Sequence, residues 1–510
     1  MMFFKKFLKL ILNKWFIFAL LILIQLVGLS YLIYDKLYEQ FNVFYLILFA
    51  SVLSAFAVLS IIRREYNPAY KISWIILVSF LPVIGPLFYL LYGKMSVSYF
   101  LKKASYKSSH DIYAYLHDFE REIEINNPNF KKMSKYITKI TGMPVWDKTS
   151  TVIYNRGIDI FEAIKISLKE AKKFIFIEIF IIAEGRMLNE ITEILIEKAK
   201  EGIDVRFIYD DFGGSARIPS RYKKRLSKNG IKIKTFNPLL PRMSSSINYR
   251  DHRKIIVIDG NIAFTGGINF ADEYINENIR FGIWKDGGIR LIGHGVFNFT
   301  MMFLNMWEIL NRTTDSYEKY TPTISKETDG FVLPFPDGPL DGNQTTGNVY
   351  LKIISSATKY VYITTPYLIL DNELLVGLKI AAMSGVDVRI ITPNIPDKRV
   401  VFIVTKSYYR ELINAGVKIY QYTPGFIHTK SIISDDVLGI VGTANFDFRS
   451  LYLHFEDSCL LYKNSSLINL RNDFLETVAI SKKIEKEDLK KEGIIKKFVL
   501  AILKVFSPLM

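Results

Sequence analysis

The residues best suited to chemistry occur in two copies of one motif. Both copies fit HxKxxxxD and share a downstream glycine and asparagine: His252, Lys254, Asp259 and Asn269 in the first copy, and His428, Lys430, Asp435 and Asn445 in the second. Each residue of the second copy follows its counterpart by 176 positions, as from His252 to His428. One such motif would occur by chance in about a few per cent of chains. Two matched copies therefore indicate an internal duplication.

These residue types suit a reaction at a phosphodiester. Residues i and i+2 of a strand point to the same face, so His252 and Lys254 project together, as do His428 and Lys430. If the two halves pack about a pseudo-twofold axis, all four side chains reach one cavity. One imidazole can then attack phosphorus while the other protonates the leaving oxygen. The lysines, helped by the two downstream asparagines, would stabilise charge on the equatorial oxygens.

No metal or other cofactor is expected for this chemistry, because the lysines supply the positive charge. Cys459 is the single cysteine of the sequence, which excludes an intramolecular disulfide and a cysteine metal cluster. Of the four histidines outside the motifs, His110, His117 and His294 have no ligand-like spacing, and the role of His454 is left open.

The segments around the motifs alternate between helix-like and strand-like patterns. In the first half they are 161–173, 174–182, 191–201 and 203–209, and in the second half 360–365, 373–384 and 386–392. This alternation predicts α/β lobes with a mainly parallel sheet. Glu178 interrupts an apolar strand, and a buried carboxylate needs a partner. It lies either at the edge of a pocket or in an ordinary buried pair.

Apolar segments precede these lobes. Half of the residues are hydrophobic, and the mean hydropathy is +0.17. Residues 15–34, 43–62 and 72–92 are uncharged runs long enough to cross a membrane as helices. The first is too long for a signal peptide and has no cleavage site after it, which favours an anchor. Pro82, Gly85 and Pro86 interrupt the third run and could make it kinked or re-entrant.

We therefore expect five parts: a membrane anchor (1–95), a polar connector (96–148), a first lobe (149–325), a second lobe (326–482) and a basic amphipathic tail (483–510). The tail could lie in the membrane interface or dock on the protein. The basic loop with Arg63, Arg64 and Lys71 is predicted to be cytoplasmic. If residues 72–92 span completely, the lobes face outward, and span count favours this. If they are re-entrant, the lobes face the cytoplasm.

The net charge of +16 indicates an anionic partner, either nucleic acid or acidic lipid, and charge alone does not choose between them.

The duplicated motif resembles that of the phospholipase D superfamily, in which two similar lobes share one active site. The resemblance is longest with bacterial cardiolipin synthases and extends from about residue 43 to the end. It is carried by 248–254, 266–274, 365–367, 446–450 and the amino-terminal residues 74–93. Asp251 and His454 stand where that family usually or often has asparagine. The first apolar segment is an addition to the usual two.

The resemblance implies roles for further residues. An acidic residue downstream of each motif orients a motif histidine, which points to Asp286 and Glu456. Asp259 and Asp435 are implied to be structural charge partners. By analogy with the usual assignment, His252 is the nucleophile and the histidine of the second motif is the general acid, although the two motifs are nearly symmetric in sequence.

The implied reaction is phosphatidyl transfer between two phosphatidylglycerol molecules, giving cardiolipin and glycerol through a phosphatidyl-histidine intermediate. The implied setting is a bacterial cell membrane, with anionic lipid and no nucleic acid as partner. Another membrane-bound phospholipase D-type enzyme is the alternative: a phospholipase D, a phosphatidylserine synthase or a nuclease. A non-catalytic lipid-binding scaffold is a further alternative, but it would be expected to lack a motif histidine or lysine, and all four are present.

Overall fold

The computed structural model describes residues 42–93, 99–119, 127–219, 221–238, 248–328, 330–340, 342–489 and 493–509. The described residues fall into two compact units. The smaller unit contains the amino-terminal helices and residues 501–509, and the larger unit contains both halves of the duplication. The apolar segment expected at 15–34 lies outside the described residues.

The smaller unit begins with α3 (Asn42–Arg63), which covers the second apolar run. The third run does not form one helix. Asn67 caps α4 (Pro68–Phe80), whose proline stands at its first position, where no amide hydrogen is needed. The chain then turns and continues as α5 (Ile84–Phe88) and the π-helical turn η1 (Tyr89–Gly93).

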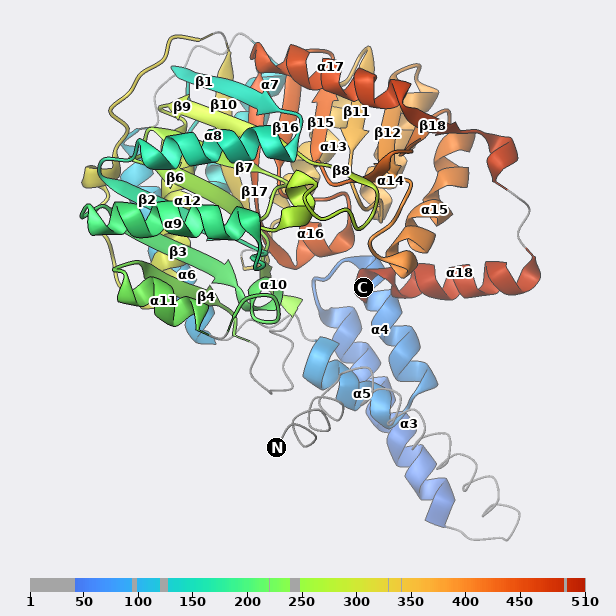
Figure 1. Cartoon of the computed structure of the whole chain (residues 1–510). Coiled ribbons are helices and arrows are strands. Elements are labelled where there is room, and N and C mark those ends of the chain that lie inside the picture. Colours follow the sequence, from blue (N-terminus) through green and yellow to red (C-terminus); the bar gives the residue numbers. More distant parts are fainter. Residues whose placement is uncertain are drawn as a thin grey trace. The chain divides into compact units, whose positions relative to one another are not determined.

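The third run is folded back on itself (Figure 1). A Cβ atom at Gly85 would lie 2.6 Å from the Cα of Val78, so the close packing of α5 on α4 requires glycine there. The hydroxyl of Tyr70 donates to the carbonyl of Gly93 at 3.1 Å, which joins the start of α4 to the end of η1. The two ends of this segment therefore meet, as in the re-entrant alternative.

In the part of the chain that the structure describes, no helix combines the length and the apolarity needed to cross a membrane.

The end of the tail packs within the smaller unit. The tail forms α18 (Ile494–Phe506) and the short η6 (Ser507–Leu509). The hydroxyl of Ser73 on α4 donates to the carbonyl of Val505 at 2.5 Å. Ile502 remains 42% exposed. The last residues therefore dock on protein, whereas α18 still carries an exposed apolar side chain.

The first half forms a seven-stranded sheet in the order β1-β9-β7-β6-β2-β3-β4. The strands are β1 (Thr149–Tyr154), β2 (Phe174–Ile179), β3 (Asp204–Asp210), β4 (Lys232–Phe236), β6 (Lys254–Ile258), β7 (Ile262–Gly266) and β9 (Gly288–Gly293). The helices are α8 (Gly157–Lys169), α9 (Arg186–Lys200), α10 (Asp211–Gly214), α11 (Tyr222–Lys228) and α12 (Val296–Asn311). Ile175 and Ile177 pack under α8 and α9, whereas Phe176 stacks on Phe303 of α12, so helices cover both faces.

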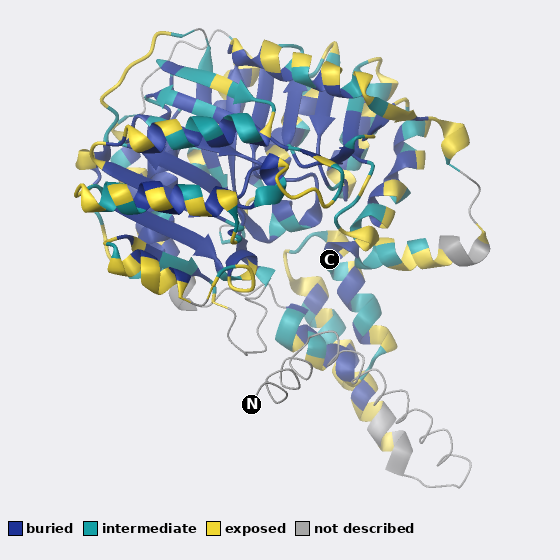
Figure 2. Cartoon of the chain, viewed as in Figure 1, coloured by how far each residue is buried: buried dark blue, intermediate teal, exposed yellow. Residues whose placement is uncertain are grey.

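The second half repeats this plan in a sheet of eight strands in the order β10-β17-β16-β15-β11-β12-β13-β18, and β5 (Arg250–Asp251) of the first half pairs with β17 as a ninth strand. The strands are β10 (Phe331–Asp337), β11 (Tyr360–Thr364), β12 (Asp387–Pro393), β13 (Lys418–Tyr422), β15 (Ser431–Ser434), β16 (Leu438–Gly442), β17 (His454–Tyr462) and β18 (Ser481–Ile484). The helices are α13 (Thr345–Ser356), α14 (Asn372–Met383), α15 (Arg399–Asn414), α16 (Phe448–Tyr452) and α17 (Ser466–Ala479). The strands of both halves are largely buried, and the exposed residues gather on the outer faces of the helices (Figure 2).

The prediction of mainly parallel sheets is wrong, because both sheets are mixed. Along the two strand orders given above, β2-β3-β4 and β11-β12-β13, which are joined through helices, are parallel, and the other neighbouring strands are antiparallel. Each motif strand instead continues into a hairpin. Asp259 and Gly260 adopt positive φ between β6 and β7, and Asp435 and Asp436 do so between β15 and β16. In each case a turn of three residues, 259–261 or 435–437, connects two antiparallel strands.

The expected connector contains two packed helices, α6 (Tyr99–His117) and α7 (Pro128–Thr141). Ser108 of α6 donates to Glu308 of α12 at 2.6 Å, and the ring of Phe130 stacks 3.9 Å from that of Tyr462. Asn127 caps α7 and thus begins a helix rather than breaking the structure.

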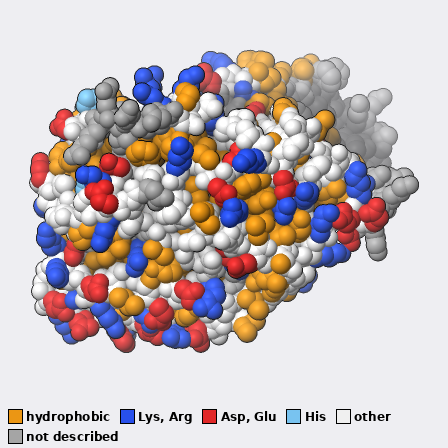
Figure 3. All heavy atoms as spheres, turned by 90° about the horizontal axis from the view of Figure 1, so that it is seen from above, with side chains coloured by type: hydrophobic (Ala, Val, Ile, Leu, Met, Phe, Trp, Pro, Cys, Tyr) orange, Lys and Arg blue, Asp and Glu red, His pale blue; other side chains and the backbone are white. Residues whose placement is uncertain are grey.

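On the face shown in Figure 3, basic side chains are interspersed with acidic ones.

Candidate active site

Each motif histidine lies where the chain changes strand partners between the two halves. The short β5 (Arg250–Asp251) pairs with β17 of the second half, and β6 then enters the first sheet at Lys254. Likewise β14 (Gly425–Ile427) pairs with β8 (Ile283–Lys285) of the first half before β15 begins. The motifs therefore do not lie in continuous strands as expected, because one straight strand could not serve both pairings.

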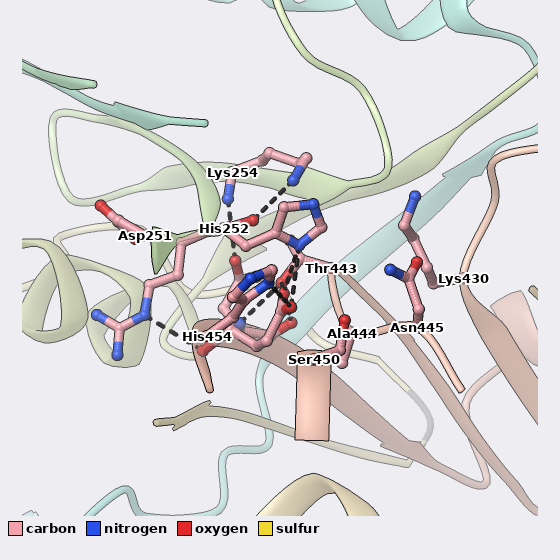
Figure 4. Close-up of polar contacts among 12 residues, drawn as sticks. Asp251, His252, Lys254, Lys430, Thr443, Ala444, Asn445, Ser450 and His454 are labelled. Carbon is pink, nitrogen blue, oxygen red and sulfur yellow. Dashed lines mark hydrogen bonds and ion pairs between the residues drawn. The ribbon is translucent and has the colours of Figure 1, made fainter. Parts of the chain in front are cut away.

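The acidic partner of each histidine comes from the opposite half. The Nδ1 atom of His252 lies 2.8 Å from Oε2 and 3.0 Å from Oε1 of Glu456 (Figure 4). The Nδ1 atom of His428 lies 2.7 Å from Oδ2 of Asp286. All four side chains are buried. Neither motif histidine therefore finds its carboxylate partner within its own half.

The two carboxyl groups favour one tautomer of each imidazole. Burial alone would raise the pKa of Glu456, but the charge of His252 and its hydrogen bond lower that pKa well below its usual range. Burial alone would also raise the pKa of Asp286, but the charge of His428 and its hydrogen bond lower that pKa. An ionised carboxylate accepts the Nδ1 hydrogen of its histidine, which leaves the Nε2 lone pair free.

The pKa values of both motif histidines are shifted so as to favour their neutral forms. Burial lowers the pKa of His252 well below its usual range, with a further lowering by the charge of Lys254. Burial and the charge of Lys430 lower the pKa of His428 to about 4. A bound phosphodiester anion would oppose these shifts, because a nearby negative charge favours the protonated imidazole.

The two motif lysines are buried and turn back toward their own motifs. Lys254 donates to the carbonyl of His252 at 2.7 Å, and Lys430 donates to that of His428 at 2.5 Å. Burial lowers the pKa of Lys254 to about 8 and that of Lys430 to about 7, against the opposing charges of nearby carboxylates. The charge of Lys254 also lowers the pKa of Lys430, so both motifs act in one electrostatic environment.

The two downstream asparagines differ in their contacts. Asn269 accepts from the amide of Ile181 at 2.9 Å and donates to the hydroxyl of Tyr274 at 2.7 Å. Asn445 donates to Asp447 at 3.1 Å, whereas its Oδ1 has no hydrogen-bond partner among the described residues. Asn445 lies beside Lys430 in Figure 4. Asn269 therefore orders the surrounding loops, and Asn445 retains a free acceptor near a motif lysine.

The aspartates that complete the two motifs bind backbone amides. Asp259 accepts from the amides of residues 172–174 at 2.7–2.9 Å. Asp435 accepts from the amides of residues 358–360 at 2.7–2.9 Å. Each carboxylate thus ties the hairpin after a motif strand to the start of the neighbouring strand. These contacts are with amides, whereas the sequence analysis expected charged partners.

One position differs between the two motifs, with glycine in the first and threonine in the second. The difference has a structural reason that sequence reasoning missed. The hydroxyl of Thr443 donates to Oε2 of Glu456 at 2.6 Å. The equivalent residue of the first motif is Gly267, where a Cβ atom would lie 2.0 Å from Oδ1 of Asp286. Only glycine leaves space for that carboxylate. The signal in the sequence that could have revealed this was the difference between Gly267 in the first copy and Thr443 at the same place in the second.

Further buried polar residues support the first motif. Asp457, which sequence reasoning also missed, accepts from the amide of Lys254 at 3.1 Å and from the hydroxyl of Thr265. Glu178 is fully buried, 3.7 Å from the guanidinium of Arg253. Burial raises its pKa well above the usual range, and the charge of Asp251 adds to this. Glu178 therefore belongs to a buried polar cluster with Asp251 and Arg253, in which its protonated form is favoured.

Comparisons with known proteins agree with this geometry. The family described as "Cardiolipin synthase, PLD-like domain" matches residues 164–285 and 350–478, and "Phospholipase D-nuclease N-terminal" matches 52–94. A Streptococcus mutans protein described as uncharacterized is 42% identical over 463 residues, which cover 89% of this chain and 99% of that protein. Cardiolipin synthase 2 of Bacillus cereus is 36% identical over 468 residues, 90% of each chain. The crystal structure of phosphatidylserine synthase from Haemophilus influenzae has a similar fold, with a TM-score of 0.57 at 15% identity over 75% of this chain and 98% of that one.

Proposed function

This chain belongs to the phospholipase D-like cardiolipin synthase family, and we propose that it joins two phosphatidylglycerol molecules to give cardiolipin and glycerol. The observation that carries the proposal is the crosswise pairing of His252 with Glu456 and of His428 with Asp286. A two-step transfer needs one imidazole as nucleophile and one as proton donor, and this pairing supports both.

In the first step, Nε2 of His252 attacks the phosphorus of one phosphatidylglycerol. The bond from phosphorus to the headgroup glycerol oxygen breaks, and His428 in its protonated form gives that oxygen a proton. The step releases glycerol and leaves a phosphatidyl group on His252. Glu456 stabilises the positive charge that develops on the attacking imidazole, because its carboxylate accepts the Nδ1 hydrogen.

In the second step, the terminal glycerol hydroxyl of another phosphatidylglycerol gives its proton to His428 and attacks the same phosphorus. The bond between phosphorus and nitrogen breaks, which frees His252 and releases cardiolipin. Lys254 and Lys430 in their charged forms stabilise the equatorial oxygens in both steps. Asn445 assists with its amide group.

The amino-terminal part, which includes α3 and the hairpin of α4 and α5, anchors the enzyme to the membrane. Both lipid substrates are confined to the bilayer, so an anchored enzyme meets them at high local concentration. The match of residues 52–94 to a phospholipase D-nuclease amino-terminal family supports this assignment.

The proposal is tested with the full chain in neutral detergent micelles and phosphatidylglycerol labelled in its acyl chains. We expect labelled cardiolipin and free glycerol in equal amounts, and added glycerol should slow the net reaction by reversing the first step. Phosphatidic acid as the main product would instead show that water is the acceptor and that the chain is a hydrolase. No lipid product would reject both activities.

A further inference from the structure

His454 has no place in the reaction described above, yet it lies inside the site. Its side chain is 9% exposed, and neither ring nitrogen has a hydrogen-bond partner among the described residues. Buried polar atoms without a partner are rare in proteins, and each calls for an explanation such as a bound water or ion. Its Nδ1 atom lies 3.6 Å from Oε1 of Glu456, and its ring centre lies 5.5 Å from that of His252.

These neighbours converge because of the strand that carries them. Residues 454 and 456 are two positions apart in β17 and therefore point to the same face. The pairing of β5 with β17 brings His252 against that face, and its amide donates to the carbonyl of Phe455 at 2.9 Å. Figure 4 shows the rings of His252 and His454 together over this strand.

The three side chains form a potential metal-ligand set. His252, His454 and Glu456 each offer one donor atom, and these atoms lie within 4.8 Å of one another. Two imidazoles and one carboxylate are a ligand set that Zn²⁺ uses with a water as fourth ligand. A tetrahedral ion about 2.1 Å from each donor needs donors about 3.4 Å apart. Binding therefore requires small movements: Nδ1 of His252 and Oε2 of Glu456, 2.8 Å apart, must separate slightly, and donors as far as 4.8 Å apart must approach by about an ångström.

We propose that His252, His454 and Glu456 bind one divalent first-row ion of the Zn²⁺ type, and that the bound ion inhibits phosphatidyl transfer. The binding part of this inference is independent of the proposed function, whereas the inhibition rests on it.

The inhibition follows from where the proton of His252 must go. In the active form, the proton is on Nδ1, facing Glu456, and Nε2 holds the lone pair that attacks phosphorus. A metal ion on Nδ1 takes that position, so a neutral ring must carry its proton on Nε2. Nε2 then has no lone pair, and the nucleophile is lost without any covalent change.

The test is calorimetric titration of the full chain in neutral detergent with ZnCl₂, in the absence of lipid. We expect one ion per chain in the wild type and at least a tenfold weaker affinity in His454→Asn, which removes the imidazole but keeps a polar amide. His110→Asn is the matched control, because His110 is 70% exposed, and its affinity should equal that of the wild type. Co²⁺ in place of Zn²⁺ should give absorption bands of a tetrahedral site that His454→Asn lacks.

The second arm measures cardiolipin formation with increasing Zn²⁺. Relative to its own metal-free rate, His454→Asn should need at least tenfold more Zn²⁺ for half inhibition than the wild type does, and EDTA should restore the wild-type rate. Equal zinc affinity in the wild type and His454→Asn, or absence of binding, would overturn the site. Stoichiometric binding without inhibition would retain the site and overturn its regulatory role. A chain that forms no cardiolipin but binds zinc through His454 would reject the proposed function and keep the site.

Discussion

The Oδ2 atom of Asp286 lies 2.7 Å from Nδ1 of His428, although 142 positions of the chain and the boundary between the two halves separate them. The opposite pair, His252 and Glu456, has the same geometry at 2.8 Å. Each imidazole thus faces one carboxylate, so the charge of the partner is the same for both. They differ in that Thr443 also donates to Glu456, whereas Gly267 stands at the corresponding place beside Asp286.

The first prediction assigns the nucleophile. His428→Ala should still accumulate a phosphatidyl-protein when given a donor with a good leaving group, because only the proton donor is missing. His252→Ala should form none. Acid quenching followed by detection of labelled lipid on the protein measures this. A labelled His252→Ala protein and an unlabelled His428→Ala protein would reverse the two roles.

The second prediction concerns the space beside Asp286. Gly267→Ala should lower turnover at least tenfold, because its Cβ would displace the carboxylate that orients His428. Gly347→Ala is the matched control, since a Cβ there meets only side-chain atoms at 3.7 Å or more. Both rates are measured alongside thermal unfolding. Equal activity of the two variants would show that Asp286 can move without consequence.

The motif lysines are the subject of the third prediction. Lys254→Ala and Lys430→Ala should each reduce turnover by about two to three orders of magnitude, the scale of losing one transition-state donor. Arginine at either position should restore only part of the rate, because a planar guanidinium replaces a compact ammonium. Steady-state rates on micelles measure both effects. Full activity of an alanine variant would remove that lysine from the mechanism.

The fourth prediction is a pH dependence. The pKa of Lys430 is lowered to about 7, mainly by burial, so its charged form is lost as pH rises through that value. Because the charged form stabilises the transition state, kcat/KM should fall above about pH 7. In Lys430→Arg the fall should move above about pH 8, the pKa of Lys254, since arginine stays charged. An unchanged alkaline limb in that variant would assign the titration to another group.

The fifth prediction places the lobes relative to the membrane. Tyr70 contacts Gly93, so the hairpin of α4 and α5 returns the chain to the side from which it started. We therefore expect the lobes on the same side as the basic loop of Arg63 and Arg64, which is predicted to be cytoplasmic. A phosphatase reporter fused after Lys103 should be inactive although well expressed. High phosphatase activity would favour the fully spanning alternative, which span count alone had suggested.

Much of the site was predictable because its residues are marked by local spacing. The duplication revealed His252 and His428, and the resemblance pointed to Glu456 and Asp286. Which acid serves which histidine was not predictable, because a chain with two similar halves is equally consistent with pairing within each half. The answer depends on the short strands β5 and β14, which pair with the opposite half and are too short to leave a pattern.

The fold, too, was predictable where it depends on neighbouring residues and not where it depends on distant ones. The alternation of segments correctly located the strands and helices from β2 to β3 and from β11 to β12, since each has its own hydrophobic period. The predicted strand direction was wrong. The hairpins that begin at Asp259 and Asp435 depend on left-handed backbone at individual turn residues, which the hydrophobic pattern does not reveal. His454 was left without a role because its meaning depends on His252, 202 positions away, which only the folded chain brings near.

The crosswise pairing has a consequence for the order of events during synthesis. A growing chain released as far as the end of the first half would contain His252 and Asp286, but neither would have its partner. Contacts between residues so far apart in sequence form late in folding, because a long loop must close first. A nascent or truncated polypeptide that lacks the second half therefore contains neither histidine–carboxylate pair, and the enzyme becomes chemically competent only after β5 and β14 have paired with the opposite halves.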